Sequence, residues 1–117
     1  MKSNFIYCRL STGEDKIIIN KLHIVSVLEN WIQNPNSEKE DLIPGGLLVS
    51  LKDGRTYIIN DNMYHFLPLL KGFNFCSTKD SKILYRLIKA NPAEDIYYFF
   101  DRNGKTIKLN SKHFRSF

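Results

Sequence analysis

Five cationic side chains near the C-terminus have the residue types and spacing of a phosphate-binding surface. Within residues 102–117 the basic residues are Arg102, Lys105, Lys108, Lys112 and Arg115, and this segment has no Asp or Glu. Lysine and arginine bind nucleic-acid phosphates mainly through charge, so the binding depends strongly on salt and weakly on base sequence. The segment therefore predicts nucleic-acid contacts.

The position of the net charge supports this interpretation. The chain has 117 residues with 17 Lys or Arg and 12 Asp or Glu, giving a net charge of +5. The five cations of residues 102–117 leave 12 basic and 12 acidic side chains elsewhere, which balance. All of the excess positive charge therefore lies in the last 16 residues. Such a local stripe attracts polyanions whatever the charge of the whole chain.

Aromatic residues alternate with these cations and allow two interpretations. The rings in or beside the segment are those of Tyr97, Tyr98, Phe99, Phe100, Phe114 and Phe117. Exposed rings on a β-surface can stack on the bases of a single strand. In the alternative interpretation, alternate rings fill a core and the lysines keep an edge strand from aggregating.

Other residue types that carry chemistry do not form a recognisable site. His23, His65 and His113 have no second His or Cys at a metal-ligand spacing, so we expect no metal and no cofactor. The acidic run at residues 38–41 lies in a polar, turn-rich stretch, where catalytic geometry is hard to maintain. A phosphate-binding Gly-rich loop and a nucleophile elbow are both missing from the sequence. We therefore expect no catalytic residues, and a protein that is not an enzyme.

Cysteine usage and hydropathy predict a cytoplasmic protein that does not enter a membrane. Cys8 and Cys76 are too few for a disulfide framework and are expected to be free thiols. Residues 1–7 lack the apolar region of a signal peptide. Every apolar run is shorter than a membrane span.

The clearest structural element is a β-hairpin over residues 45–60. Asp53-Gly54 joins two apolar runs, and this dipeptide favours the tight turn of a two-stranded hairpin. Between residues 30 and 44 the chain is polar and turn-rich, which predicts an exposed loop. Further strands are expected at residues 4–10, 16–20, 22–28, 95–101 and 105–110.

Two short helices are expected. The first spans residues 63–70, with Asn60 or Asp61 as its N-cap and with Pro68 shortening or kinking it. The second has Ser77, Thr78 or Asp80 as its N-cap and continues through Asn91, where Asn91-Pro92 ends it. Its inner side would consist of Ile83, Leu84, Leu87 and Ile88, and its outer side of Lys82, Arg86 and Lys89.

These elements predict a single domain over residues 1–117. Its expected class is β-rich α+β, with about six or seven antiparallel strands in hairpins and two short helices packed on one face. Such a fold would place the basic segment 102–117 partly on the last hairpin.

Residues 16–71 resemble the C-terminal half of the LytTR DNA-binding domain of bacterial response regulators. The matching stretches are Ile17-Ile18-Ile19-Asn20, Ile24, Gly46 to Arg55, Tyr57-Ile58-Ile59 and Tyr64 to Leu70. The chain is also similar to small flagellar-regulator proteins of the FlbD type, through Arg9-Leu10, Gly13, Ile19-Asn20, Val27-Leu28-Glu29 and residues 51–59. Both resemblances imply a small, non-catalytic bacterial regulatory or accessory protein, and the LytTR resemblance implies DNA binding.

The chain departs from the LytTR pattern at the positions that usually approach phosphates. Where the family has His, Arg and Ser before the strand ending in Asn, this chain has Glu14-Asp15-Lys16. After the last strand it has Asn60 to Met63 in place of Ser and basic residues. DNA contacts are therefore expected from the C-terminal segment and not from the surface that the family uses.

A protein-interaction module without nucleic-acid binding is the alternative interpretation. The apolar residues after the central hairpin are numerous for one small core, and an exposed remainder would serve a partner or a homodimer. The candidate contact residues are Met63, Phe66, Phe73 and Phe75.

Overall fold

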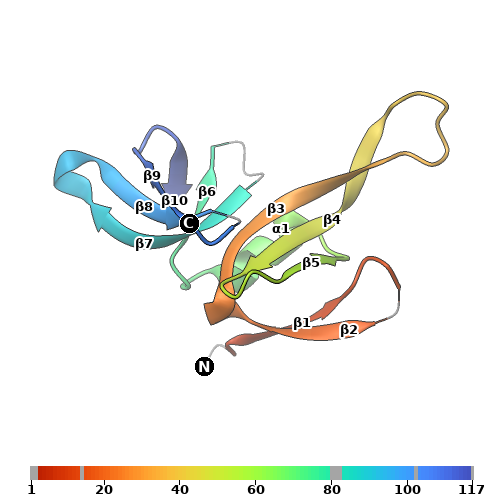
Figure 1. Ribbon diagram of the computed structural model, residues 1–117, viewed down its shortest axis with the longest axis horizontal. Coiled ribbons are helices and arrows are strands. Elements are labelled where there is room, and N and C mark those ends of the chain that lie inside the picture. Colours follow the sequence, from red (N-terminus) through yellow and green to blue (C-terminus); the bar gives the residue numbers. More distant parts are fainter. Residues whose placement is uncertain (1–2, 14, 80–82, 102, 117) are drawn as a thin grey trace.

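Antiparallel strands make up most of this elongated molecule, which is seen in Figure 1 as a computed structural model. The structure describes residues 3–13, 15–79, 83–101 and 103–116, and its principal extents are 50 × 36 × 24 Å. The described residues form β1 (Phe5–Arg9), β2 (Lys16–Asn20), β3 (Ile24–Gln33), β4 (Leu42–Leu51), β5 (Thr56–Ile59), β6 (Phe75–Thr78), β7 (Ile83–Asn91), β8 (Ile96–Phe100), β9 (Thr106–Leu109) and β10 (Phe114–Ser116).

Helical structure is short and lies between strands. The α-helix α1 (Met63–Phe66) continues into the 3-10 helix η2 (Leu67–Leu70), and the change coincides with Pro68, which lacks a backbone donor. Two further 3-10 turns are η1 (Lys21–His23) and η3 (Pro92–Glu94). The described residues contain no helix with the length and apolar content that crossing a membrane requires.

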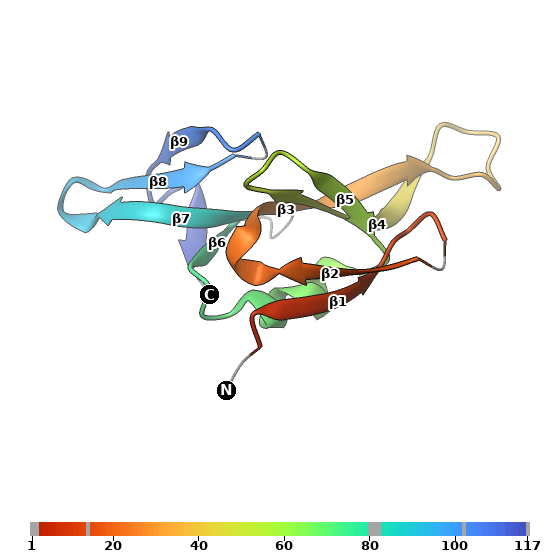
Figure 2. The same ribbon diagram turned by 60° about the horizontal axis from the view of Figure 1, so that its bottom comes forward.

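The strands belong to two antiparallel sheets that meet at β5. In the larger sheet the order is β10-β6-β7-β3-β4-β5, with β8 paired to β7 and β9 paired to β8. The smaller sheet is the β1–β2 hairpin, which reaches β5 through a bridge between Leu10 and Ile59. Figure 2 shows this hairpin lying across the β3–β5 sheet, with α1 beside it.

The first five strands and α1 enclose the larger of two hydrophobic cores, here called core 1. It is buried because alternate residues of each strand face inward, as in Ile6 and Cys8 of β1 and Val27 of β3. Met63 and Phe66 of α1 close the core. Its remaining buried members are Ile19, Ile24, Leu47, Val49, Leu51, Ile59, Leu70, Phe75 and Leu84.

A second core, core 2, lies on the other side of β6 and β7. Cys76, Phe99 and Phe114 are its buried members. Successive residues of a strand point to opposite faces, so Leu84 of β7 packs in core 1 while Tyr85 packs against core 2. Strands β6 and β7 therefore separate the two cores and contribute side chains to each of them.

A long ribbon projects from the sheet where β3 and β4 extend beyond their other partners (Figure 1). Strand β7 pairs with β3 only at residues 26–28, and β5 pairs with β4 only at residues 47–50. At its root the register shifts between Glu29 and Trp31, opposite Gly45-Gly46. Gly46 has φ +95°, and a Cβ there would lie 2.3 Å from the carbonyl oxygen of Ile59, so only glycine fits. We call residues 29–46 the β-arm.

Two of the expected elements were wrong in type or length. Residues 83–91, expected as a helix, form strand β7, because their apolar residues serve both cores from opposite faces of one strand. The exposed loop expected over residues 30–44 is shorter, at 34–41, because Ile32 pairs with Ile43 and Gln33 with Leu42. The β-rich class with a short helical segment at 63–70 is confirmed, but the strands are more numerous than expected.

Candidate nucleic-acid interface

The described C-terminal lysines lie on a small lobe built around core 2, seen at the left of Figure 1. We call residues 83–116, which include β7, β8, β9 and β10, the C-terminal lobe. In its three-stranded part, β7 pairs with β8 and β8 pairs with β9. Leu87, Phe99 and Ile107 lie opposite one another on these strands and pack in or against core 2. The other face of β7–β8–β9 points outward.

A row of three side chains crosses this outer face. Lys89 of β7 is the register partner of Tyr98 of β8, and Tyr98 is the partner of Lys108 of β9. Residues directly opposite in an antiparallel sheet share a face, with Cβ atoms about 5 Å apart. Both lysines are exposed and Tyr98 is half-buried. The row thus presents an aromatic ring between two cations.

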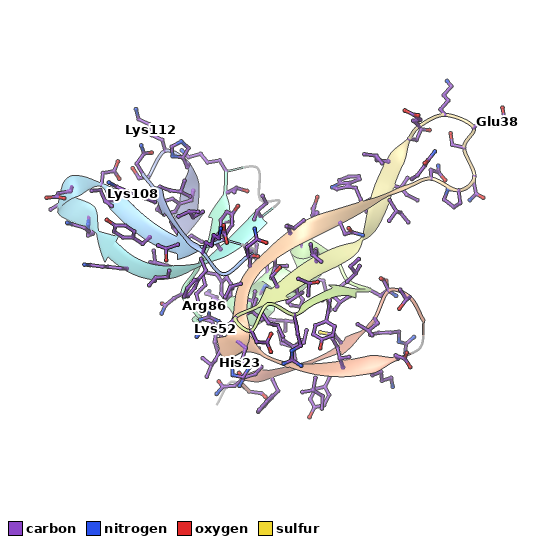
Figure 3. The ribbon with its side chains drawn as sticks, viewed as in Figure 1. His23, Glu38, Lys52, Arg86, Lys108 and Lys112 are labelled. Carbon is purple, nitrogen blue, oxygen red and sulfur yellow. The ribbon has the colours of Figure 1, made fainter. Side chains whose placement is uncertain are left out.

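Two more cations extend the positive surface at the ends of β9. Lys105 lies in the β8–β9 turn, where the Oδ1 of Asp101 accepts bonds from the backbone N–H of Asn103 at 2.8 Å and of Lys105 at 2.9 Å. Lys112 follows β9, and its backbone N–H donates to Asn110 Oδ1 at 3.1 Å. Both lysine side chains are exposed, and Figure 3 shows Lys108 and Lys112 on the same lobe.

The nearby carboxylates bind the backbone. Asp95 accepts from the backbone N–H of Ser111 at 3.0 Å, and Asp101 accepts the two turn N–H groups described above. Among the described residues the ion pairs are those of Arg55 with Asp53 and of His65 with Asp61. The four exposed lysines of the lobe therefore keep their charge available to an external anion.

An open groove lies beside the row of Lys89, Tyr98 and Lys108. It has a volume of about 290 Å³ and is lined by Asp95, Ile96, Lys108, Leu109, Asn110 and His113. Its polar lining comes from a carboxylate, an amide, an imidazole and an ammonium group. Of these, the amide, imidazole and ammonium groups can donate hydrogen bonds to phosphate and sugar, while the carboxylate of Asp95 can only accept them.

The structure divides the expected aromatic surface into inner and outer rings. Phe114 packs edge-on against Tyr97 and against Phe99, with ring centroids 4.8 Å apart in both pairs. These three rings belong to core 2, as the alternative interpretation has it, and are not free to stack on bases. Tyr98 and Phe100 alternate with them and lie on the outer face.

Two of the five expected cations fall partly or wholly outside the described structure. Arg102 lies outside the described residues, as does Phe117. Arg115 lies on β10, with Ser77 of β6 as its register partner, and only its backbone is described. Lys105, Lys108 and Lys112 are brought to one lobe, and Lys89 joins them.

Lys89 was missed because residues 83–91 were interpreted as a helix. On a helix Lys89 would have been one of several solvated cations. On a strand it takes a defined place in register with Tyr98. The Asn-Pro pair at residues 91–92 followed by the aromatic run at 96–100 was the available signal, since it is typical of a hairpin as well as of a helix end.

The apolar residues of the alternative interaction surface face inward. Met63, Phe66 and Phe75 are 5%, 0% and 3% exposed and belong to core 1, while Phe73 is half-buried against it. This part of the alternative interpretation is therefore wrong, because these side chains are not exposed to a partner.

His23, His65 and the two cysteines lie apart from the lobe's outer row. His65 Nδ1 is 3.0 Å from Asp61 Oδ1 at the surface near α1. In the described parts of the chain, no three His, Cys, Asp or Glu residues are grouped so as to hold a metal ion. Burial raises the pKa of the Cys8 thiol to about 11, with a smaller contribution from the charge of Asp61. Burial also raises the pKa of Cys76.

Comparison with known proteins finds no similar one: no family model, no curated protein and no solved structure matches this chain.

Proposed function

We propose that this protein binds nucleic acid through the outer face of its C-terminal lobe. The observation that carries the proposal is the row Lys89–Tyr98–Lys108, which sets an aromatic ring between two unpaired cations on an open sheet face. Lys105 and Lys112 add charge at the two ends of β9. This arrangement combines phosphate contacts with a ring that can stack on a base.

The expected binding mode is electrostatic with limited base readout. Four lysines without carboxylate partners displace condensed counterions from the nucleic acid, so the affinity falls steeply with salt. A single aromatic ring on an open face favours single strands, whose bases are free to stack. The resemblance of residues 16–71 to LytTR domains lends loose support to DNA as the nucleic acid, although the surface that the family uses is not kept, and it leads us to propose a regulatory or accessory role in a bacterial cytoplasm.

The test is a fluorescence-anisotropy titration of the whole chain with labelled single-stranded and duplex oligonucleotides at several salt concentrations. We expect a log–log salt slope that corresponds to about three to five released counterions. The triple variant Lys105→Ala, Lys108→Ala, Lys112→Ala should lose this binding. A control with the same loss of charge replaces the exposed Arg9, Lys16 and Lys52, which lie away from the lobe, by Ala.

The matched control separates a specific surface from a general charge effect. If both triple variants weaken binding equally, net charge alone is responsible and the lobe is not the interface. If the wild type does not bind at low salt, the proposal fails.

A further inference from the structure

The β-arm carries large apolar side chains that are exposed, as the β1–β2 hairpin also does. Trp31, Ile32 and Leu42 are 43%, 45% and 64% exposed, although large apolar side chains are usually buried. Ile32 pairs with Ile43 on one face of the ribbon, while Trp31 and Leu42 lie on the other. The arm therefore carries apolar side chains on both faces, away from either core.

The strand edges of the β-arm are also open among the described residues. The pairing of β3 with β7 ends at Leu28, and the pairing of β4 with β5 ends at Leu47. Beyond these points each strand of the arm pairs with the other, and no further strand pairing of either is found among the described residues. Unpaired backbone groups beside exposed apolar side chains form a surface that readily associates with another chain.

The charge of the β-arm indicates which chain it associates with. Residues 29–46 contain four acidic side chains and one basic side chain, and three of the acids, Glu38, Glu40 and Asp41, lie at or beside the tip and are exposed. Among the described side chains of the C-terminal lobe, four lysines and one acid, Glu94, are exposed. The molecule thus has a negative arm and a positive lobe.

The acidic arm and the basic lobe of one molecule are too far apart to contact each other. Figure 3 shows Glu38 at the tip of the arm on one side of the molecule and Lys108 and Lys112 on the other, with the β3–β5 sheet between them. Complementary surfaces at opposite ends of a molecule meet only between copies, in a head-to-tail contact.

We propose that the β-arm of one copy docks on the C-terminal lobe of a second copy. The apolar side chains around Trp31 become covered, and the acidic tip lies near Lys105 and Lys108. Because the contact is head-to-tail, a pair of copies keeps one free arm and one free lobe, and the assembly grows with concentration unless it closes into a ring. The same lysines serve the proposed nucleic-acid interface, so an oligonucleotide competes with the arm.

Charge reversal tests the contact directly. The arm variant Glu38→Lys, Glu40→Lys and the lobe variant Lys105→Glu, Lys108→Glu each place like charges on both surfaces. Measured by analytical ultracentrifugation, each variant alone should associate at least tenfold more weakly than wild type. A mixture should associate again with the two variants alternating, because the reversed arm of the first fits the reversed lobe of the second and the native arm of the second fits the native lobe of the first. The control Lys16→Glu, Lys52→Glu should associate as wild type does.

The chain's single tryptophan gives a second readout, since Trp31 lies on the arm. Its emission should shift to shorter wavelength as the wild type is concentrated, and should not shift in the lobe variant, where Trp31 is unchanged. The proposal is overturned if the wild type stays monomeric, or if the lobe variant still associates, which would indicate an arm-to-arm contact. It also fails if the mixture forms no complex.

This inference stands apart from the proposed function. The arm variant keeps all lysines of the lobe, so it should bind oligonucleotides while its self-association is lost. Oligonucleotide binding without self-association would overturn only the docking proposal, and the reverse would overturn only the proposed function.

Discussion

The Nε of Arg86 donates to the carbonyl oxygen of Ile24 at 2.6 Å, across 62 residues of sequence. The same guanidinium donates to the carbonyl oxygens of Phe73, at 3.0 Å, and of Lys21. Its Cζ lies 4.7 Å from the centroid of the Phe75 ring. Burial lowers the pKa of Arg86. One side chain of β7 therefore ties together the start of β3, η1 and the segment that leads into β6.

Replacing Arg86 by Met should destabilise the protein by about 3–5 kcal/mol, because buried carbonyls lose charged hydrogen bonds and gain none. Urea unfolding followed by circular dichroism measures this loss. Lys89→Met is the matched control, since Lys89 lies on the same strand and is exposed, and it should change stability by less than about 0.5 kcal/mol. Equal effects of the two variants would show that Arg86 does not hold these segments.

Gly46→Ala should lower the stability of the fold by more than the positive φ of this residue alone explains. Gly46 and Gly54 have φ +95° and +90°, but an added Cβ meets the Ile59 carbonyl oxygen at Gly46 and nothing within 4 Å at Gly54. Gly54→Ala should therefore cost about 1–2 kcal/mol, and Gly46→Ala at least twice as much, because β5 must move. Thermal unfolding of the two variants makes the comparison. Similar melting temperatures would contradict the close approach of β4 and β5 at the root of the β-arm.

Asn62, and not Asn60 or Asp61, caps α1. Its Oδ1 accepts from the backbone N–H of His65 at 2.9 Å. Asn62→Ala should lower the free energy of unfolding by about 1 kcal/mol. Asn60→Ala should have little effect, because Asn60 is exposed and bonds to Arg9 through its backbone N–H, which alanine keeps. A larger loss of unfolding free energy in the Asn60 variant than in the Asn62 variant would show that the assignment of the cap to Asn62 is wrong.

Cys8 should make the protein less stable at alkaline pH. Its thiol has a pKa of about 11 when folded, against an ordinary value of 9.0. Between these pH values the folded state binds more protons than the unfolded state, so stability falls as pH rises, by at most about 1.4 kcal/mol per pH unit. This decline should be shallower in Cys8→Ala when both proteins are unfolded with urea at pH 8 to 11. Parallel curves would show that Cys8 does not contribute.

Tyr98→Ala should weaken binding of a single-stranded oligonucleotide by about tenfold, the usual loss of one stacked base. Tyr98→Phe should keep most of the affinity, since the ring is retained. Tyr64, which is 93% exposed and lies on α1, provides the control substitution Tyr64→Ala. Anisotropy titrations of the folded variants test this. An equal loss in Tyr98→Phe would indicate a role for the hydroxyl and not for stacking.

The local part of the fold could be predicted from the sequence. Asp53-Gly54 and Asn103-Gly104 mark tight turns between short apolar runs, and the strand at Lys16–Asn20 has the predicted bounds. Pro68 shortens the α-helix as expected. These features depend on residues close together in the chain, where turn chemistry and alternation decide the structure.

The part of the fold that was predicted wrongly depends on contacts between residues that are far apart in the sequence. The run at residues 83–88 fits a helix with one apolar face, but it is a strand because each face meets a different core, and neither core is visible locally. For the same reason Lys89 was separated from Lys108, although the two flank Tyr98. The role of Arg86 rests on carbonyls up to 65 residues away, which no periodicity reveals.

The strands β6 and β7, which separate core 1 from core 2, also set an order of events during synthesis on the ribosome. Strands β3 and β4 are neighbours in sequence and can pair as soon as both have emerged, but one edge of β3 waits for β7, whose first residue is Ile83. Until then Val27 and its neighbours form an open apolar edge, the state in which nascent β-proteins aggregate. Completion of core 1 therefore depends on the last third of the chain. A nascent chain that is released before β7 has been synthesised would keep that edge of β3 exposed.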